Sequence, residues 1–421
     1  MRAIKNSILY SSLSLIGIIL ISIILFSSCK QIIVNHSEVM VNEEENEIIA
    51  EKIDPIEIQA EEIVSSMDDR QLAAQIIISG IDGRGILSTN SKNMLKQTPA
   101  GGIMFFSYNL NNNNDAIRAF VNEIVSFIKD ETDIPPFIAV DHEGGFVNRF
   151  RPAVTTLPAA ASYWEQFQNE GRIETLKKIE EDSLKSGSDI NALGFNMNFA
   201  PVAEYLVDEN RRFLINRSYG PDPIFTAQAA NAFVRGMEQA GVLCVVKHFP
   251  GSAGPDPHHS LSVLNMDKLS LNRFIYPFAV LINLGARAVM AAHTLTPAID
   301  SKIASLSPAV MQNWLRDELG FDGIIISDDF IMAAAGNIHP EEAAVQSITA
   351  GSDMILVWPR DLKKTHDTIL AALKDGRLPK VRLLNAATRI VYEKIRMGMI
   401  ENFQEASNEE EESSNDTNER E

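Results

Sequence analysis

The feature that most constrains the fold is a series of eight short apolar runs, separated by segments with the periodicity of amphipathic helices. The runs are rich in Ile, Val, Met and Phe and do not alternate polar with apolar residues, which is typical of parallel strands buried on both faces. They span residues 75–80, 102–107, 137–141, 196–200, 243–249, 288–293, 323–328 and 353–357. Helical patterns lie between them, for example at 114–128, 173–188, 224–240, 307–319 and 340–350. This alternation predicts an α/β fold with a single (β/α)8 barrel of the TIM type, its strands paired in chain order.

Polar residues stand at the ends of five consecutive runs, the third to the seventh. They are Asp141, then Asn198 and Glu204, then Lys247 and His248, then His293, and finally Asp328. The carboxyl ends of barrel strands meet on one rim, where enzymes of this fold place their chemistry. A single such residue could be a satisfied polar group of the core, but five in succession predict an active site. Asp328, held at a strand end, could act there as a nucleophile, a metal ligand or an acceptor for a sugar hydroxyl.

The loop after the fifth run carries ionisable groups at close spacing. Three of the eight histidines of the chain lie in 247–259, and its prolines and glycines exclude a helix. Pro257 favours an extended conformation at Asp256, and side chains two residues apart on an extended segment point the same way. Asp256 can therefore orient His258 and fix its tautomer, as a carboxylate does for a catalytic histidine. His259 is the alternative, and both histidines could instead be solvated loop residues.

The N-terminus has the features of a secretion signal. Arg2 and Lys5 precede a nearly uninterrupted apolar or hydroxylic stretch that ends in Ser27-Ser28-Cys29. Small residues before a cysteine resemble a bacterial lipobox, which implies a signal peptide over 1–28 and lipidation of Cys29. The alternative is an uncleaved transmembrane anchor. Both interpretations place the rest of the chain outside the cytoplasm and on a membrane, and we expect a membrane-anchored lipoprotein in the periplasm or at the cell surface.

Most of the net charge of −19 lies in two short segments. Residues 43–62 hold nine acids and one lysine, and residues 401–421 hold nine acids and one arginine. Such segments are typical of solvated, flexible chain. We therefore expect a lipidated cysteine and acidic linker over 29–62, a catalytic domain over 63–400 and a disordered tail over 401–421. No basic stripe points to nucleic acid, and we expect a monomer.

Several motifs resemble glycoside hydrolase family 3. The segment 320–330, Gly-Phe-Asp-Gly-Ile-Ile-Ile-Ser-Asp-Asp-Phe, is similar to the active-site signature of that family. The segment 247–251, Lys-His-Phe-Pro-Gly, and the Asp-x-His that follows it resemble the β-N-acetylglucosaminidase (NagZ-type) branch. Further similarity lies at 141–145, 198–202 and 216–220, so the resemblance runs in family order from about residue 67 to 398.

The resemblance implies a retaining, exo-acting enzyme that removes terminal N-acetylglucosamine (GlcNAc) through a covalent glycosyl-enzyme intermediate, without a metal or other cofactor. Asp328 would be the nucleophile, and His258, oriented by Asp256, would be the general acid and then the general base. The residues implied in binding the terminal sugar are Asp141, Arg149, Arg217, Lys247 and His248. The chain departs from the family in a loop about two residues shorter before Asp256, and in His142, Phe146 and Glu204, where Gln, Arg and Asp are usual.

Several alternatives remain at this point. Peptidoglycan fragments are the expected glycan outside the cytoplasm, with chitin-type oligosaccharides or phosphorolysis of GlcNAc as alternatives. A β-glucosidase of the same family is a further possibility. A metal-dependent barrel hydrolase would use His248, Asp256, His258 and His293 as ligands. A catalytically inactive lipoprotein that only binds glycan belongs to a different class.

Overall fold

The structure is a computed structural model that describes residues 54–111, 113–150, 153–254, 260–330 and 338–402. Cys29, Asp256, His258 and His259 lie outside the described residues, so the signal, the lipidation site, the acid/base pair and the disordered tail stay predictions. All the helices and strands that the structure describes belong to the unit that begins at Pro55.

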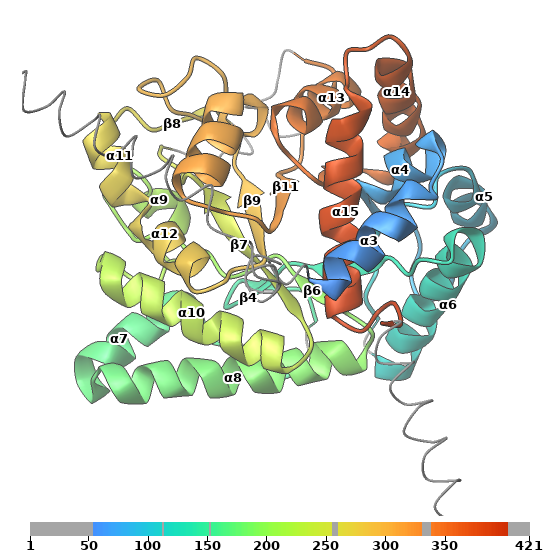
Figure 1. Ribbon diagram of the computed structural model, residues 1–421. Helices are drawn as coiled ribbons and strands as arrows, with labels where there is room; N and C mark the ends of the chain where they lie inside the picture. The colour runs from blue at the N-terminus through green and yellow to red at the C-terminus, as the bar shows by residue number, and fades with distance from the viewer. Residues whose placement is uncertain (1–53, 112, 151–152, 255–259, 331–337, 403–421) are drawn as a thin grey trace, which may run out of the picture. The chain divides into compact units, whose positions relative to one another are not determined.

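The core of this unit is a parallel barrel with its strands in chain order (Figure 1). Its strands are β1 (Ile77–Gly80), β2 (Gly102–Phe105), β3 (Phe137–Val140), β6 (Met197–Asn198), β7 (Leu243–Phe249), β9 (Ala288–Ala291), β11 (Ile324–Ser327) and β12 (Ile355–Val357). From β1 to β11 each strand pairs in parallel with the next, and β12 pairs in parallel with β1. A bridge between Ile326 and Met354 joins β11 to the segment before β12 and completes the ring. The predicted barrel, its eight strands and their sequential pairing are therefore confirmed.

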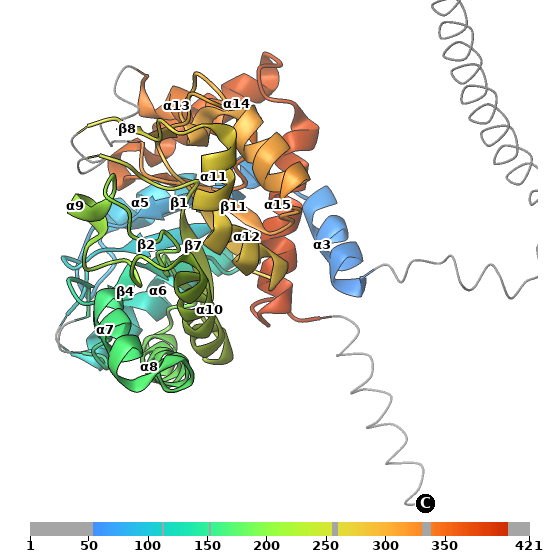
Figure 2. The same ribbon diagram turned by 90° about the vertical axis from the view of Figure 1, so that its left-hand side faces the viewer.

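Helices cover the outside of the barrel (Figures 1 and 2). They are α3 (Pro55–Ser65), α4 (Asp69–Gln75), α5 (Thr89–Gln97), α6 (Asn114–Thr132), α7 (Ala160–Glu170), α8 (Arg172–Ala192), α10 (Pro223–Gln239), α11 (Lys268–Phe274), α12 (Tyr276–Asn283), α13 (Pro340–Ala350), α14 (Leu362–Lys374) and α15 (Lys380–Arg396). The short α9 (Arg211–Leu214) lies instead at the pocket, which its Phe213 lines. The predicted helix at 307–319 is present as the π-helical segment η2 (Ala309–Glu318), with the short η1 (Ala304–Leu306) before it and η4 (Pro359–Asp361) after β12. Within the described residues, no helix is long and apolar enough to cross a membrane.

The helix α6 illustrates why these segments are helical and where they face. The Asn113 side chain accepts hydrogen bonds from the backbone N–H groups of residues 115 and 116 and so caps the first turn. Ile117, Phe120, Val121, Ile124 and Ile128 are buried, and their spacing of three and four residues puts them on one face. That face packs on the barrel, while the charged residues of the helix lie on the outside.

The predicted linker is shorter than the sequence suggested, because α3 includes residues 55–62. Its apolar positions Ala60 and Val64 are buried, and Gln59 Nε2 donates a hydrogen bond of 2.7 Å to the backbone oxygen of Glu401. In both views α3 lies beside α15, the last helix (Figures 1 and 2). The many acids of this segment suggested solvated chain, although its apolar residues recur at helical spacing. Burial of those apolar residues against α15 makes α3 part of the folded unit.

A buried carboxylate stabilises the seam where the barrel closes. The side chain of Asp353, just before β12, accepts hydrogen bonds from the backbone N–H of Ile325 at 2.9 Å, from Arg316 and from Arg382. Burial alone would raise the pKa of Asp353, but Arg316 and Arg382 outweigh burial and hold that pKa below its ordinary value. The Asp353 carboxylate thus links η2, β11 and α15 next to the N-terminal end of β12.

Candidate active site

A pocket of about 300 Å3 opens at the carboxyl ends of the barrel strands. Its size lies at the lower end of the range for ligand pockets, about 300–1,000 Å3. The lining residues are Asp141, Glu143, Val147, Arg149, Phe199, Phe213, Arg217, Lys247, His248, Ser252, Met290, Ala292, His293, Thr294, Asp328 and Leu356. They come from strands between β3 and β12 and from the segments that follow those strands, so the polar strand ends predicted from the sequence belong to one site.

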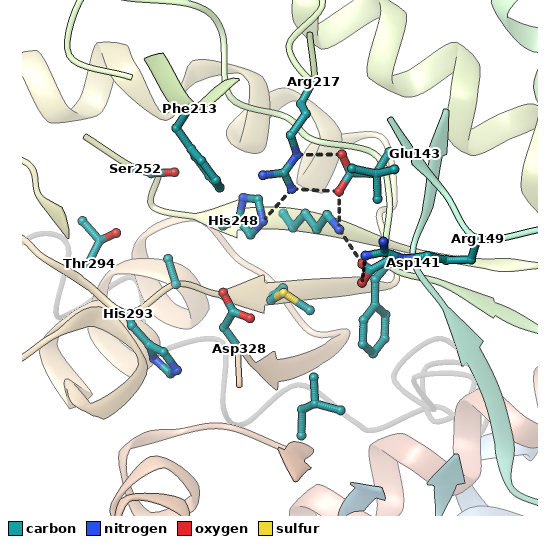
Figure 3. Close-up of a pocket in the computed structure, with 16 residues that line it drawn as sticks. Asp141, Glu143, Arg149, Phe213, Arg217, His248, Ser252, His293, Thr294 and Asp328 are labelled. Carbon is teal, nitrogen blue, oxygen red and sulfur yellow. Dashed lines mark hydrogen bonds and ion pairs between the residues drawn. The ribbon is translucent and has the colours of Figure 1, made fainter. Parts of the chain in front are cut away.

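One wall of the pocket is an ionic cluster of Asp141, Glu143, Arg149, Arg217 and Lys247 (Figure 3). Lys247 Nζ lies 2.8 Å from Asp141 Oδ1 and 2.7 Å from Glu143 Oε1. Arg217 holds Glu143 by two bonds, with Nε and Nη2 each 2.8 Å from a carboxylate oxygen. Arg149 Nη2 lies 3.5 Å from Asp141 Oδ2. Charge-assisted bonds of this kind fix the positions of Asp141, Glu143, Arg217 and Lys247, and Arg149 lies beside them at ion-pair distance.

The cluster keeps its members ionised although they are largely buried. Burial alone would raise the pKa of Glu143, but Arg217 and Lys247 outweigh it and hold that pKa far below its ordinary value. Burial would likewise lower the pKa of Lys247, but Asp141 and Glu143 raise it above its ordinary value. Fixed and largely buried charges are strong donors and acceptors for a polar ligand.

The backbone conformation after β3 explains how Asp141 and Glu143 both reach Lys247. Asp141 directly follows β3, and the chain then turns back as the short ribbon β4 (His142–Gly144) and β5 (Val147–Asn148). Gly144 and Gly145 have φ values of +95° and +55°, and a Cβ on Gly144 would lie 2.2 Å from the oxygen of Pro158. Only glycine tolerates this turn without strain. The turn presents Glu143 to the pocket and returns the chain to Arg149.

His248, at the end of β7, is oriented by a buried carboxylate. Its Nδ1 lies 2.7 Å from Glu204 Oε1, and Glu204 Oε2 accepts from Ser252 N at 2.5 Å and from Ser252 Oγ at 2.7 Å. Burial would raise the pKa of Glu204, but His248 and Ser252 hold that pKa below its ordinary value. The ionised carboxylate therefore accepts a hydrogen bond from His248 Nδ1. His248 Nε2 is left on the side of the pocket, 3.4 Å from Arg217 Nη2.

Asp328 stands across the pocket from the Glu143–Arg217 pair, and its carboxylate points into the cavity (Figure 3). It directly follows β11, and its Oδ1 accepts a bond of 2.9 Å from the backbone N–H of Asp329. Next to it, His293 donates from Nε2 to the oxygen of Asp329 at 2.9 Å, while Nδ1 lies 2.6 Å from Ser305 Oγ. Burial lowers the pKa of His293, so the ring next to Asp328 is neutral at pH 7.

The structure thus brings six of the predicted site residues to one pocket: Asp141, Arg149, Arg217, Lys247, His248 and Asp328. Asp256 and His258, the predicted acid/base pair, lie outside the described residues. The sequence did not single out Glu143 or Ser252 as functional; it placed Glu204 among the polar strand ends and noted it as a departure from the family, but gave it no role. Glu143 sits between two glycines and an aspartate of the 141–145 motif, and that context was the available signal for it.

His142 and Phe146, two of the departures from the family pattern, lie in different environments. His142 is buried behind the pocket, where its Nε2 lies 2.9 Å from Ser186 Oγ and burial lowers its pKa to about 4. Phe146, at the tip of the β4–β5 turn, is 78% exposed. Neither side chain lines the pocket.

In the parts of the chain that the structure describes, no group of three or more His, Cys, Asp or Glu side chains is placed to hold a metal ion.

Comparisons with known proteins agree with this geometry. The glycosyl hydrolase family 3 N-terminal domain matches residues 69–392. The β-hexosaminidase of Methylococcus capsulatus is 36% identical over 295 residues, which are 69% of this chain and 84% of that protein. A family 3 β-N-acetylglucosaminidase from Paenibacillus sp. str. FPU-7 is 31% identical with a TM-score of 0.74; the match covers 79% of this chain but only 63% of that longer one. NagZ from Neisseria gonorrhoeae, in complex with N-trifluoroacetyl-D-glucosamine, is 28% identical with a TM-score of 0.64, covering 77% of this chain and 93% of that one.

The matched residues include every barrel strand and every described residue that lines the pocket. The fold, the motifs and the relatives therefore agree with the resemblance found in the sequence. The chain belongs to glycosyl hydrolase family 3, and it is a glycoside hydrolase of the β-hexosaminidase type.

Proposed function

We propose that this protein is a retaining, exo-acting β-N-acetylglucosaminidase that removes one terminal GlcNAc at a time. The observation that carries the proposal is the pairing of a fixed carboxylate, Asp328, with an ionic cluster across a pocket of about 300 Å3. Such a pocket suits a single sugar ring, because the charged groups offer both donors and acceptors to its hydroxyls. A carboxylate on one side of the ring is what a retaining glycosidase needs to form a covalent intermediate.

The sugar would be held by the charged groups opposite Asp328. Asp141 accepts from hydroxyl groups, while Arg149, Arg217 and Lys247 donate to their oxygens. Arg149 also lines the pocket, where it can reach the same ligand. His248, with Nδ1 bound to Glu204, offers Nε2 to the same ligand. Since all these groups are prearranged, the binding energy is not spent on ordering side chains.

Two proton transfers would accompany the two covalent steps. In the first, an Asp328 oxygen attacks C1, the glycosidic C1–O bond breaks, and His258 gives its proton to the departing oxygen. In the second, water attacks C1, its proton passes to His258, and the bond from C1 to Asp328 breaks. One group has to donate first and accept afterwards, and histidine is the side chain whose unperturbed pKa lies near the working pH. Double inversion at C1 gives a product of retained configuration.

Hydrolysis of aryl glycosides tests this proposal. We expect the protein to cleave 4-nitrophenyl N-acetyl-β-glucosaminide far faster than 4-nitrophenyl β-glucoside, to give the β-anomer first by NMR, and to be indifferent to EDTA. His258→Ala should slow cleavage of the unactivated disaccharide N,N′-diacetylchitobiose more than that of the aryl glycoside, because a good leaving group needs less protonation. His259→Ala is the matched control.

Other outcomes would select the alternatives. Loss of activity in EDTA would indicate a metal-dependent hydrolase, and a faster glucoside reaction would indicate a β-glucosidase. A sugar 1-phosphate formed in phosphate buffer would indicate phosphorolysis. No turnover with measurable glycan binding would indicate a binding protein, and a stronger effect of His259→Ala than of His258→Ala would reassign the acid/base.

We further propose that Cys29 is lipidated and that the enzyme acts on peptidoglycan fragments outside the cytoplasm, with chitin-type oligosaccharides as the second candidate. The motivation is the apolar stretch that ends in Ser-Ser-Cys. Wild-type protein expressed in bacteria with a labelled fatty acid should carry the label, and Cys29→Ala should not. Cys244→Ala, at a buried cysteine, is the control and should be labelled like wild type. Wild-type protein that partitions into detergent without the label would instead support an uncleaved anchor.

A further inference from the structure

Phe213 is an aromatic side chain of the pocket that the proposed binding of the terminal sugar does not use. It lies on α9, lines the cavity and is only half-buried. The guanidinium of Arg217 lies over its ring, with Cζ 4.8 Å from the ring centroid. A cation over an aromatic face attracts the ring, and Arg217 is itself held by two bonds to Glu143. The ring is therefore fixed at the edge of the ionic cluster.

The contacts of the ionic cluster form a row with Phe213 at one end. From Asp141 the row passes through Lys247 to Glu143. From Glu143 it passes through Arg217 to Phe213. In Figure 3, Asp141 and Phe213 accordingly lie on either side of the Arg217–Glu143 pair. The row of charged groups proposed to bind the terminal sugar therefore ends at Arg217, and Phe213 lies beyond that end.

Phe213 belongs to the segment beside the loop that leads from β7 to the predicted proton donor. This segment follows β6, and β6 and β7 are neighbours in the barrel. The backbone N–H of Gly254 donates to the oxygen of Glu209 at 2.6 Å, and Ser252 donates two bonds to Glu204. Ser252 lines the same pocket as Phe213. The two loops, joined in this way, form one side of the pocket, and the ring is part of that side.

The direction of displacement at C1 places the leaving group on this side of the pocket. Asp328 stands across the cavity from Arg217 and Phe213 (Figure 3). A nucleophile attacks C1 on one face of the sugar, and the leaving oxygen departs from the other face, where it meets the proton donor. The leaving group therefore points away from Asp328, toward the loops that follow β6 and β7.

The accessible part of the Phe213 ring suits an apolar ligand surface. Arg217 covers one face of the ring, and the ring is still only half-buried in the pocket wall. Aromatic surface left partly in water and held at a fixed angle gains free energy when a flat apolar face covers it. The C–H face of a pyranose ring provides such a surface. Because a cavity of about 300 Å3 suits one sugar ring, a second sugar lies at its mouth.

We propose that Phe213 is a specificity-determining residue, which stacks against the first leaving-group sugar of a β-linked amino-sugar oligosaccharide. This rests on the proposed function, in which Asp328 attacks C1 of a terminal GlcNAc. The ionic cluster binds the terminal sugar, and Phe213 determines the preference for the group attached to it. Oligosaccharides are therefore cleaved in preference to simple alkyl glycosides.

The test compares two substrates that share the terminal GlcNAc and differ only in the leaving group: N,N′-diacetylchitobiose and methyl N-acetyl-β-glucosaminide. We expect Phe213→Ala to lower the ratio of their kcat/KM values, disaccharide over methyl glycoside, by about tenfold, or about 1.4 kcal/mol. Phe213→Leu, which keeps apolar volume without a flat ring, should lower the ratio too, and Phe213→Trp should retain most of it. Phe146→Ala is the matched control, because this aromatic on the same rim is 78% exposed and does not line the pocket. That variant should leave the ratio unchanged.

Equal losses on both substrates in Phe213→Ala would overturn the assignment and leave Phe213 as a positioning residue for Arg217. An unchanged ratio in both Phe213→Ala and Phe213→Leu would overturn it as well. Calorimetric binding to Asp328→Asn gives a readout that does not need turnover. If wild type cleaves neither substrate, the proposed function fails, and the stacking role then stands only if the disaccharide binds more tightly than GlcNAc and loses that advantage in the added Phe213→Ala background.

Discussion

Asp328→Asn is expected to lower kcat on the aryl N-acetyl-β-glucosaminide by roughly 10^4-fold or more, the scale seen when a covalent nucleophile is removed. The amide cannot attack C1, so no glycosyl-enzyme forms. Its oxygen can still accept the bond that Asp328 Oδ1 now receives from the N–H of Asp329 at 2.9 Å. The pocket should therefore keep its shape, and the thermal unfolding midpoint should stay close to that of wild type.

Asp322→Asn is the matched control, because Asp322 is exposed and lies just before the same strand. That variant should keep wild-type kcat. A smaller replacement adds a chemical test: azide supplied to Asp328→Ala can attack C1 from the vacated side while the aryl oxide departs, which gives the α-glycosyl azide. Near-wild-type kcat in Asp328→Asn, or a β-azide from Asp328→Ala, would refute the nucleophile assignment.

Glu143→Gln is expected to destabilise the folded protein by about 3–5 kcal/mol at pH 7, the cost of removing one partner from a buried ion pair. The substitution leaves Arg217 and Lys247 with one anion fewer, and the Lys247 side chain is only 3% exposed. Urea denaturation measures the effect. The same variant should weaken sugar binding, because Arg217 and Lys247 lose the contact that orients them.

The difference between wild type and Glu143→Gln should depend on pH. The folded protein holds the pKa of Glu143 below its ordinary value of 4.5, so the charged form contributes stability that is complete above that value and is lost as the pH falls through the folded pKa. The difference should therefore be largest near pH 7 and shrink below about pH 4. In the control Glu318→Gln, which disrupts the exposed pair with Lys268, the change should stay below about 1 kcal/mol. A pH-independent difference, or one no larger than that control, would contradict the account of the cluster.

The fold could be predicted almost completely, because each barrel strand carries its own signature. A strand buried on both faces has to be apolar at nearly every position, and the runs around Ile78, Val245 and Ile325 satisfy that condition in the sequence itself. The start of the folded unit was predicted less well. At 55–62 the acids suggested solvated chain, and only packing against α15 determines that Ala60 is buried.

The site was predictable as a set of residues but not as a set of contacts. Asp141, Lys247 and Asp328 could be named because each ends a strand, and a parallel barrel brings such ends to one rim. The pairing of Lys247 with Asp141 spans 106 positions and that of Arg217 with Glu143 spans 74. Interactions at such separations leave no periodic signal in the chain.

The sequence by itself determined the barrel, the family and the residues at the strand ends, because burial and periodicity are local properties of a chain. The tertiary structure alone decided which charges neutralise one another, that Glu204 orients His248, and that Phe106 stacks on Trp358. Those outcomes depend on which side chains meet when the strands close into a ring, and on the removal of water that makes each contact strong.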